Sequence, residues 1–95
     1  MAAYVVAEIE ITDPVGYEEY KRQVPAVIAQ YGGRYLARGG ETAGLEGAAP
    51  HRVALLEFPS LAQAKAWWAS PEYAPLRALR DRTAHARLVA VAGLD

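Results

Sequence analysis

The stretch AYVVAEIEI, residues 3–11, is the part of the sequence that decides the fold. Its side chains alternate between two sets, as a β-strand requires, because successive residues of a strand point to opposite faces of the sheet. The first set is wholly apolar: Val5, Ala7, Ile9 and Ile11. The second set is half apolar and half acidic: Tyr4, Val6, Glu8 and Glu10. We therefore expect a strand whose second face is not simply solvated.

The segment that follows this strand has the features of a helix. Asp13 can cap the helix start, and Pro14 suits the first helical position. An apolar stripe then recurs at spacings of three and four residues: Tyr17, Tyr20, Val24, Ile28 and Tyr31. Pro25 removes one helical hydrogen bond, so we expect a kink or a break there. Gly32-Gly33 ends the helix.

Three further strands and a second helical region are predicted beyond these glycines. RYLAR (34–38) and RVALLEF (52–58) are strands separated by a glycine-rich loop, and the latter is apolar on both faces except at Glu57, which is typical of a central strand. Ser60, with Gln63 three residues later, opens the second helical region. The last strand is ARLVAVA (86–92).

This element order, β-α-β-β-α-β, predicts an α+β fold of ferredoxin-like type. Its four-stranded antiparallel sheet has the spatial order 4-1-3-2, with the two helical regions on one face. Strand 4 then lies beside strand 1, where Arg87 can neutralise Glu8 or Glu10. The uncovered face shows Tyr4, Val6, Val53 and Leu55. An apolar face of this kind is an association site, so we expect a homodimer that packs sheet against sheet.

Composition limits the function further. The 95 residues make one domain, 1–95, and the net charge of −1 argues against nucleic-acid binding. The chain has no cysteine, no visible signal peptide and no apolar run of membrane-spanning length, so we expect a cytoplasmic protein without a membrane partner. His51 and His85 lack metal-ligand spacing, and no phosphate-loop or dinucleotide motif is present. We expect neither a metal nor a cofactor.

Three segments resemble one family: IAQYGGRYLARGGETAGLEG (28–47), LLEFPSLAQAKAWWASPEY (55–73) and PLRALR (75–80). They are similar to DUF1330 proteins, small members of the dimeric α/β-barrel superfamily, and the resemblance runs from about Tyr17 to the C-terminus. It implies a ferredoxin-like fold, sheet-to-sheet dimerisation and a pocket between helices and sheet or between subunits. It implies no known reaction. The wider superfamily includes cofactor-free monooxygenases, haem-degrading enzymes, muconolactone isomerases and stress-response proteins, but shared fold is no evidence of shared activity.

Arg38, Gly39 and Glu57 are the first candidate site residues. Arg38 could clamp a carboxylate, and Gly39 would let a ligand approach the backbone; the alternative is a salt bridge at a turn. Glu57 is a candidate general base if burial raises its pKa, or a structural partner of Arg38, Arg52 or Arg34.

The remaining candidates are mostly aromatic. The family resemblance points to Trp67, Ser70 and Tyr73, which could line an apolar pocket or belong to the core between helix and sheet. Tyr20 could donate to a ligand or belong to the apolar stripe. Arg80 matches the family's helix-end arginine and could bind an anion or form a surface or intersubunit pair. His51 is either a base at a pocket mouth or a solvated loop histidine.

Three functions follow from these alternatives. The first is a homodimer that binds a small molecule, partly apolar or carboxylate-bearing. The second is a cofactor-free oxygenase or isomerase that uses Glu57 or His51 as its base. The third is a structural dimer without a ligand.

Overall fold

The computed structural model describes residues 1–94 and contains four strands and three helices. In chain order they are β1 (Ala3–Ile11), α1 (Pro14–Gln30), β2 (Arg34–Arg38), β3 (Arg52–Phe58), α2 (Leu61–Trp68), α3 (Ala74–Thr83) and β4 (Ala84–Ala92). The sheet order is β2-β3-β1-β4, with all neighbours antiparallel. The predicted ferredoxin-like fold and its strand order are therefore confirmed.

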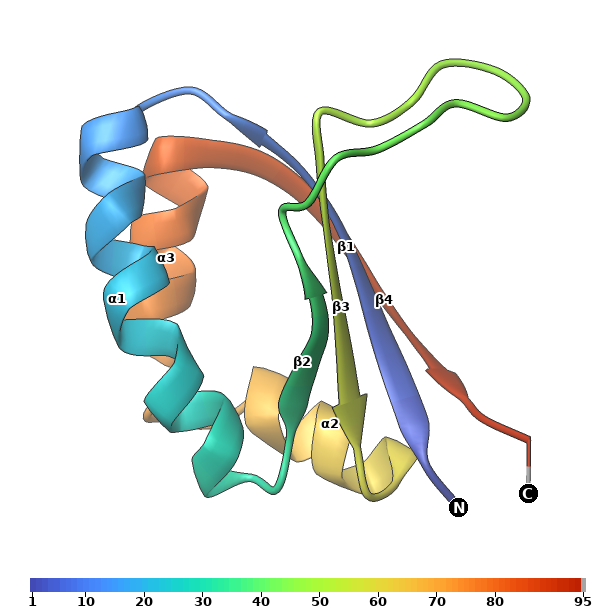
Figure 1. The fold of residues 1–95 in the computed structure, drawn as a ribbon. Coiled ribbons are helices and arrows are strands. Elements are labelled where there is room, and N and C mark those ends of the chain that lie inside the picture. The colour runs from blue at the N-terminus through green and yellow to red at the C-terminus, as the bar shows by residue number, and fades with distance from the viewer. Residues whose placement is uncertain (95) are drawn as a thin grey trace.

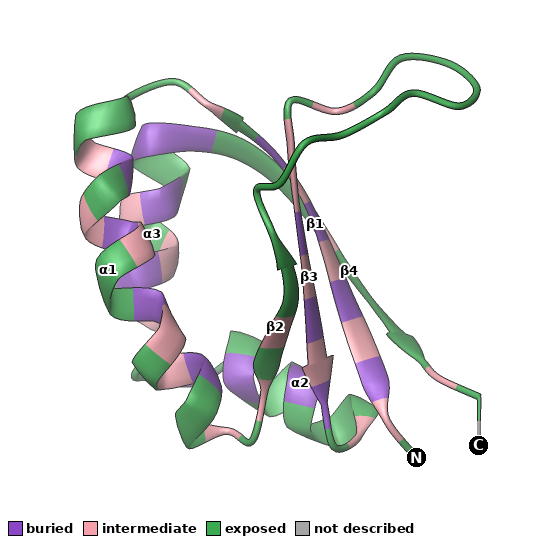
Figure 2. Cartoon of the chain, viewed as in Figure 1, coloured by how far each residue is buried: buried purple, intermediate pink, exposed green. Residues whose placement is uncertain are grey.

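All three helices lie on one face of the sheet (Figure 1). Helices α1 and α3 pack against each other, while α2 lies across the opposite end of β1 and β3. Figure 2 shows buried and part-buried residues alternating along β1, as its sequence predicts. The opposite face of the sheet has no cover from residues 1–94. No helix within that range is long and apolar enough to cross a membrane.

Local signals in the sequence fix most of the helix boundaries. The Asp13 carboxylate accepts from the Gly16 amide at 3.2 Å, and the Ser60 hydroxyl accepts from the Gln63 amide at 3.1 Å. Gly32 has φ +79°, the left-handed conformation that favours glycine after a helix. Helix α1 runs through Pro25 without a break, so the expected division is not found.

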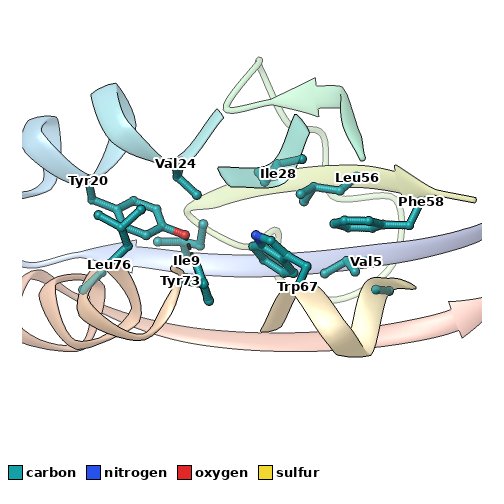
Figure 3. Packing of buried hydrophobic residues seen from close by; sticks show 14 of the residues in the cluster. Val5, Ile9, Tyr20, Val24, Ile28, Leu56, Phe58, Trp67, Tyr73 and Leu76 are labelled. Carbon is teal, nitrogen blue, oxygen red and sulfur yellow. Dashed lines mark hydrogen bonds between the residues drawn. The ribbon is translucent and has the colours of Figure 1, made fainter. Parts of the chain in front are cut away.

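The core lies between the sheet and the helices (Figure 3). Trp67 from α2 is its centre, with its ring centroid 4.3 Å from that of Tyr73 and 5.4 Å from that of Phe58. Trp67 and Tyr73 are 2% and 0% exposed. Rings of this size dominate the burial energy of a small core. Trp67 also lines the inner wall of the site described next.

Candidate functional site

A bulge in β2 decides the position of Arg38. Tyr35 lies opposite Leu56 on β3, but the register then shifts, so that Arg38 lies opposite the buried Ala54. A bulge re-aims the side chains that follow it. Arg38 consequently turns toward the helices, where its guanidinium lies 4.6 Å from the Tyr35 ring centroid and donates to the backbone carbonyl of Lys21 on α1.

Gly39 makes room for a second arginine, Arg52. Gly39 has φ +70°, and a Cβ atom there would clash with the Arg52 guanidinium. The close approach that a glycine permits is therefore made by Arg52 and not by a ligand. Arg52 begins β3 opposite Ile9, so it too lies on the helix-covered face, with its guanidinium 5.8 Å from the Tyr17 ring centroid.

A third arginine joins two tyrosines at the α1–α3 contact. Arg80 is 7% exposed, and its Nη1 donates to the Tyr73 hydroxyl at 2.9 Å. The hydroxyls of Tyr73 and Tyr20 are 2.8 Å apart, and the Tyr20 ring reaches this contact from α1 (Figure 3). Arg80 Nη2 also contacts the exposed Asp81 at 3.2 Å. Ser70 positions Tyr73, because its hydroxyl donates to the Trp67 carbonyl at 2.8 Å and accepts from the Tyr73 amide at 3.0 Å.

Burial keeps these phenols protonated. Desolvation raises the pKa of Tyr20, with the neighbouring Tyr73 adding to the effect. Desolvation also raises the pKa of Tyr73 and Tyr17, although nearby arginines partly oppose it. The pKa of Tyr35 rises to about 12 for the same reason. The tyrosines of this region are therefore neutral hydrogen-bonding groups near neutral pH.

These side chains surround a small internal cavity of about 20 Å³. Its wall includes apolar residues of the sheet and of α1, together with Tyr17, Tyr20, Tyr35, Trp67 and four basic residues, Lys21, Arg38, Arg52 and Arg80. No aspartate or glutamate within residues 1–94 lines it. Lys21, Arg38 and Arg52 also line an open groove of about 650 Å³ on the outer side, whose other charged residues are Glu18, Glu19 and Arg22. The cavity and the groove thus share one cationic boundary.

Three buried donors on this wall have no partner. They are Arg52 Nε, Trp67 Nε1 and Arg80 Nε, for which residues 1–94 supply no acceptor. Most buried polar groups in proteins are hydrogen-bonded, so three such groups around one cavity need an explanation. We call this set, with Arg38 and the Tyr20–Tyr73 pair, the donor cluster.

The carboxylates that the sequence singled out lie on the other face of the sheet. Glu57 is paired with Arg34 at 2.8 Å, so it neither meets Arg38 nor reaches the cavity. Glu8 is paired with Arg87 at 3.3 Å, as the strand order predicts. His51 is exposed, 3.6 Å from Glu10. The structure thus brings together Arg38, Trp67, Tyr73, Tyr20 and Arg80, and separates Glu57 and His51 from them.

Comparison with known proteins identifies the family. The model of the family described as "Domain of unknown function (DUF1330)" matches residues 2–94. The chain belongs to the DUF1330 family. None of the curated proteins compared with this sequence matches it significantly.

Solved structures share the fold of this DUF1330 protein at low sequence identity. A protein of unknown function from Rhodopseudomonas palustris has 19% identity and a TM-score of 0.78, covering 99% of this chain and 83% of its own. SnoaB, a cofactor-independent oxygenase from Streptomyces nogalater, has 9% identity and a TM-score of 0.69, and the match covers 99% of this chain and 94% of SnoaB. A dimeric protein of unknown function and ferredoxin-like fold from Bacteroides fragilis has 18% identity and a TM-score of 0.64, covering 97% and 96%.

Sequence reasoning missed Arg52 as a member of the site of this DUF1330 protein. The signal was present, because Arg52 is in phase with Ala54, Leu56 and Phe58, the set that faces the helices. Arg52 was considered only as a partner of Glu57, which alternation places on the opposite face. Tyr17, like Tyr20, could be read from the sequence as a phenol that donates to a ligand or as part of the apolar stripe, whereas Lys21 and Tyr35 carried no signal for the site.

Proposed function

We propose that this DUF1330 protein is a homodimer that binds a small, partly apolar molecule with a polar head, held between the helices and the sheet. The observation that carries the proposal is the set of three unpartnered buried N–H groups around one cavity. Each such group costs about 1–3 kcal/mol when no acceptor satisfies it. A ligand that supplies acceptors would recover that free energy on binding.

The shape of the site supports a ligand with two parts. The inner cavity of about 20 Å³ admits only a polar head, since a water needs roughly this much room. The outer groove is open, and Lys21, Arg38 and Arg52 stand between the two spaces. The body of a ligand would therefore lie in the groove, with its head directed past these side chains.

The uncovered sheet face supports the homodimer. Its apolar residues include Leu36, Val89 and Val91, which are 44%, 57% and 52% exposed, beside the part-buried Val6 and Leu55. Exposed apolar side chains gathered on one face are typical of an association site, and here the ion pairs Arg34–Glu57 and Arg87–Glu8 lie among them. The Bacteroides fragilis neighbour is described as dimeric. Packing two copies sheet against sheet would cover this face on both.

The enzymatic alternative receives no such support. A cofactor-free oxygenase or isomerase needs a base beside its substrate, and neither a carboxylate nor a histidine of residues 1–94 lines the inner cavity. Glu18 and Glu19 line the outer groove, but each is paired with a basic residue of α1. Glu57 and His51, the candidate bases, both have partners on the other face. The likeness to SnoaB, at 9% identity, shows a shared fold and carries no argument for a shared activity.

A thermal-shift screen tests the binding proposal. Small aromatic acids, keto acids and their neutral amides would be compared on wild type, Arg52→Gln and Arg34→Gln. Ligand at ten times Kd stabilises the protein by about 1.4 kcal/mol, which raises the midpoint of a chain this size by about 5–10 °C. We expect at least one compound to shift wild type and Arg34→Gln but not Arg52→Gln. Equal shifts in both variants, or no shift with any compound, would overturn the proposal.

Sedimentation tests the dimer. Val89→Glu puts a charge on the uncovered face and should dissociate the dimer, whereas Val15→Glu, at an α1 position that is 85% exposed, should not. A wild-type protein that sediments as a monomer at every concentration would contradict the dimer and leave the binding proposal intact.

A further inference from the structure

The donor cluster contains hydrogen-bond donors and cations but offers a ligand almost nothing that accepts. Arg38, Arg52 and Arg80 can only donate, and so can the indole of Trp67. Asp81 contacts Nη2 of Arg80 and leaves its Nε without an acceptor. A neutral ligand group that both donates and accepts would find tyrosine hydroxyls, and no carboxylate of residues 1–94, to accept its protons in this cavity.

The two tyrosines add a further donor, which follows from counting protons. Arg80 donates to the Tyr73 oxygen, so this bond uses no hydroxyl proton. The bond between the Tyr73 and Tyr20 hydroxyls uses one of their two protons, whichever atom donates it. The other proton has no acceptor among residues 1–94. When Tyr73 donates to Tyr20, the free proton is on Tyr20, which lines the cavity.

A water molecule would satisfy this site poorly. The cavity of about 20 Å³ has room for roughly one water. One water accepts two hydrogen bonds at most, so two of the four unmatched donors would remain. Tyrosine hydroxyls would have to accept its own two protons, because no carboxylate within residues 1–94 lines the cavity.

We propose that the site binds its ligand through an oxyanion, namely a carboxylate, phenolate or enolate oxygen on a small planar molecule, and prefers the ionised over the neutral form. This inference rests on the proposed function and specifies its ligand class. An oxyanion is acceptor-only and can take up several N–H and O–H donors at once. The charged or titratable groups around the inner cavity are Tyr17, Tyr20 and Lys21 of α1, Tyr35 and Arg38 of β2, Arg52 of β3, Tyr73 before α3 and Arg80 of α3. The acidic groups nearby are Glu18 and Glu19, which line the outer groove, and Asp81, which contacts Arg80. Lys21 is already paired with Glu18 at 3.1 Å, so the arginines supply most of the free positive charge.

The preference for the ionised form also predicts a change in the ligand. A phenol bound here should ionise more readily than in water, because the donors stabilise its anion and not its neutral form. A tenfold preference for the anion lowers the pKa of the bound phenol by about one unit.

Two probe series test the inference. Benzoate should bind at least about tenfold more tightly than the isosteric neutral benzamide, and the pKa of bound 4-nitrophenol, followed by its absorbance, should fall by about one unit or more. If only benzoate binds more tightly than its neutral counterpart, the oxyanion of the ligand is a carboxylate. If only 4-nitrophenol shows a lowered pKa, the oxyanion is a phenolate or enolate.

Variants locate the effect. Arg52→Gln and Tyr73→Phe should each reduce the ratio of the affinity for benzoate to the affinity for benzamide. Tyr73→Phe removes the hydroxyl and keeps the aromatic ring. Arg34→Gln removes the same charge from the opposite sheet face and should leave the ratio unchanged. Equal binding of neutral and anionic probes would overturn this inference while the proposed function stands. If neither form of any probe binds, the proposed function fails as well.

Discussion

On the open face of the sheet, Glu57, Glu8 and Glu10 each have a basic partner, whereas on the helix-covered face three arginines line one cavity and, within residues 1–94, Arg80 alone of the three pairs with a carboxylate. Stability alone would favour the reverse arrangement. A charge that leaves water is costly unless it is paired, while an exposed pair is worth only about 0–1 kcal/mol. Among these arginines the costly charge is that of Arg52, which is part-buried and has no ion-pair partner within residues 1–94, whereas Arg38 is exposed and Arg80 is paired with Asp81. This difference fits the proposed function, in which a ligand occupies the covered face and a second copy of the chain covers the open face.

Adjacent leucines of β3 give the largest test of this comparison. Leu56 is buried on the covered face, and Leu56→Ala should lower the free energy of unfolding by about 2–5 kcal/mol. Leu55→Ala deletes the same atoms from the part-buried open face and should cost only about 1 kcal/mol in dilute solution. Urea denaturation at several protein concentrations measures both.

The two leucine variants should also respond differently to concentration. The loss in Leu55→Ala should widen where wild type is dimeric and the variant is not, because association stabilises only the folded state. The loss in Leu56→Ala should stay constant. Equal losses in the two variants at the lowest concentration would show that the open face is covered within one chain.

The next largest expected effect is a fall in the free energy of unfolding at alkaline pH, which arises from the buried tyrosines on the covered face. Because burial raises the pKa of Tyr35 from 10.0 to about 12, the unfolded chain loses that proton first as pH rises. Stability is therefore complete below pH 10.0 and declines toward about pH 12. The pKa values of Tyr20 and Tyr73 are raised in the same direction.

Tyr20→Phe and Tyr73→Phe separate this effect from general alkaline damage. Each removes one buried phenol, so its free energy of unfolding should fall less steeply above pH 10 than that of wild type. Urea denaturation along a pH series measures the slopes. Identical slopes in all three proteins would show that these phenols do not govern the decline.

Arginine replacements on the two faces should have effects of opposite sign. Arg52→Met removes a buried N–H without an acceptor, at the loss of the contacts that the guanidinium makes with the ring and the hydroxyl of Tyr17, and should stabilise the ligand-free protein by up to about 1 kcal/mol. Arg34→Met leaves Glu57 without its partner and should destabilise the protein by up to about 1 kcal/mol. Urea denaturation of both variants, without ligand, decides the point. If Arg52→Met is the more destabilised of the two, the guanidinium contributes to stability and the contrast between the faces fails.

The fold could be predicted because its signals are local and periodic. Alternation over residues 3–11 and 52–58 fixed which side chains enter the core, and the caps at Asp13 and Ser60 fixed the helix starts. The continuous path of α1 through Pro25 could not be read from the sequence, because packing of the stripe on both sides of the proline decides it.

The site was only partly predictable, and the bulge in β2 explains why. Simple alternation from Tyr35 would put Arg38 on the open face, beside Glu57. The register shift between Tyr35 and Ala37 moves it to the covered face instead. No residue of RYLAR marks a bulge, so the separation of Arg38 from Glu57 emerges only from the pairing of β2 with β3.

Glu57→Gln gives the smallest expected effect and the sharpest test of that separation. The side chain of Glu57 is 25% exposed and that of its partner Arg34 is 70% exposed, so solvent screens the pair. The change should therefore cost less than about 1 kcal/mol, and the loss should shrink in high salt. Because Glu57 lies on the opposite face from the donor cluster, benzoate affinity should not change, whereas Arg52→Gln should weaken it. Isothermal titration of the two variants makes the comparison. Should Glu57→Gln weaken benzoate as strongly as Arg52→Gln does, the ligand must contact the open face, and the binding site would belong between two sheets.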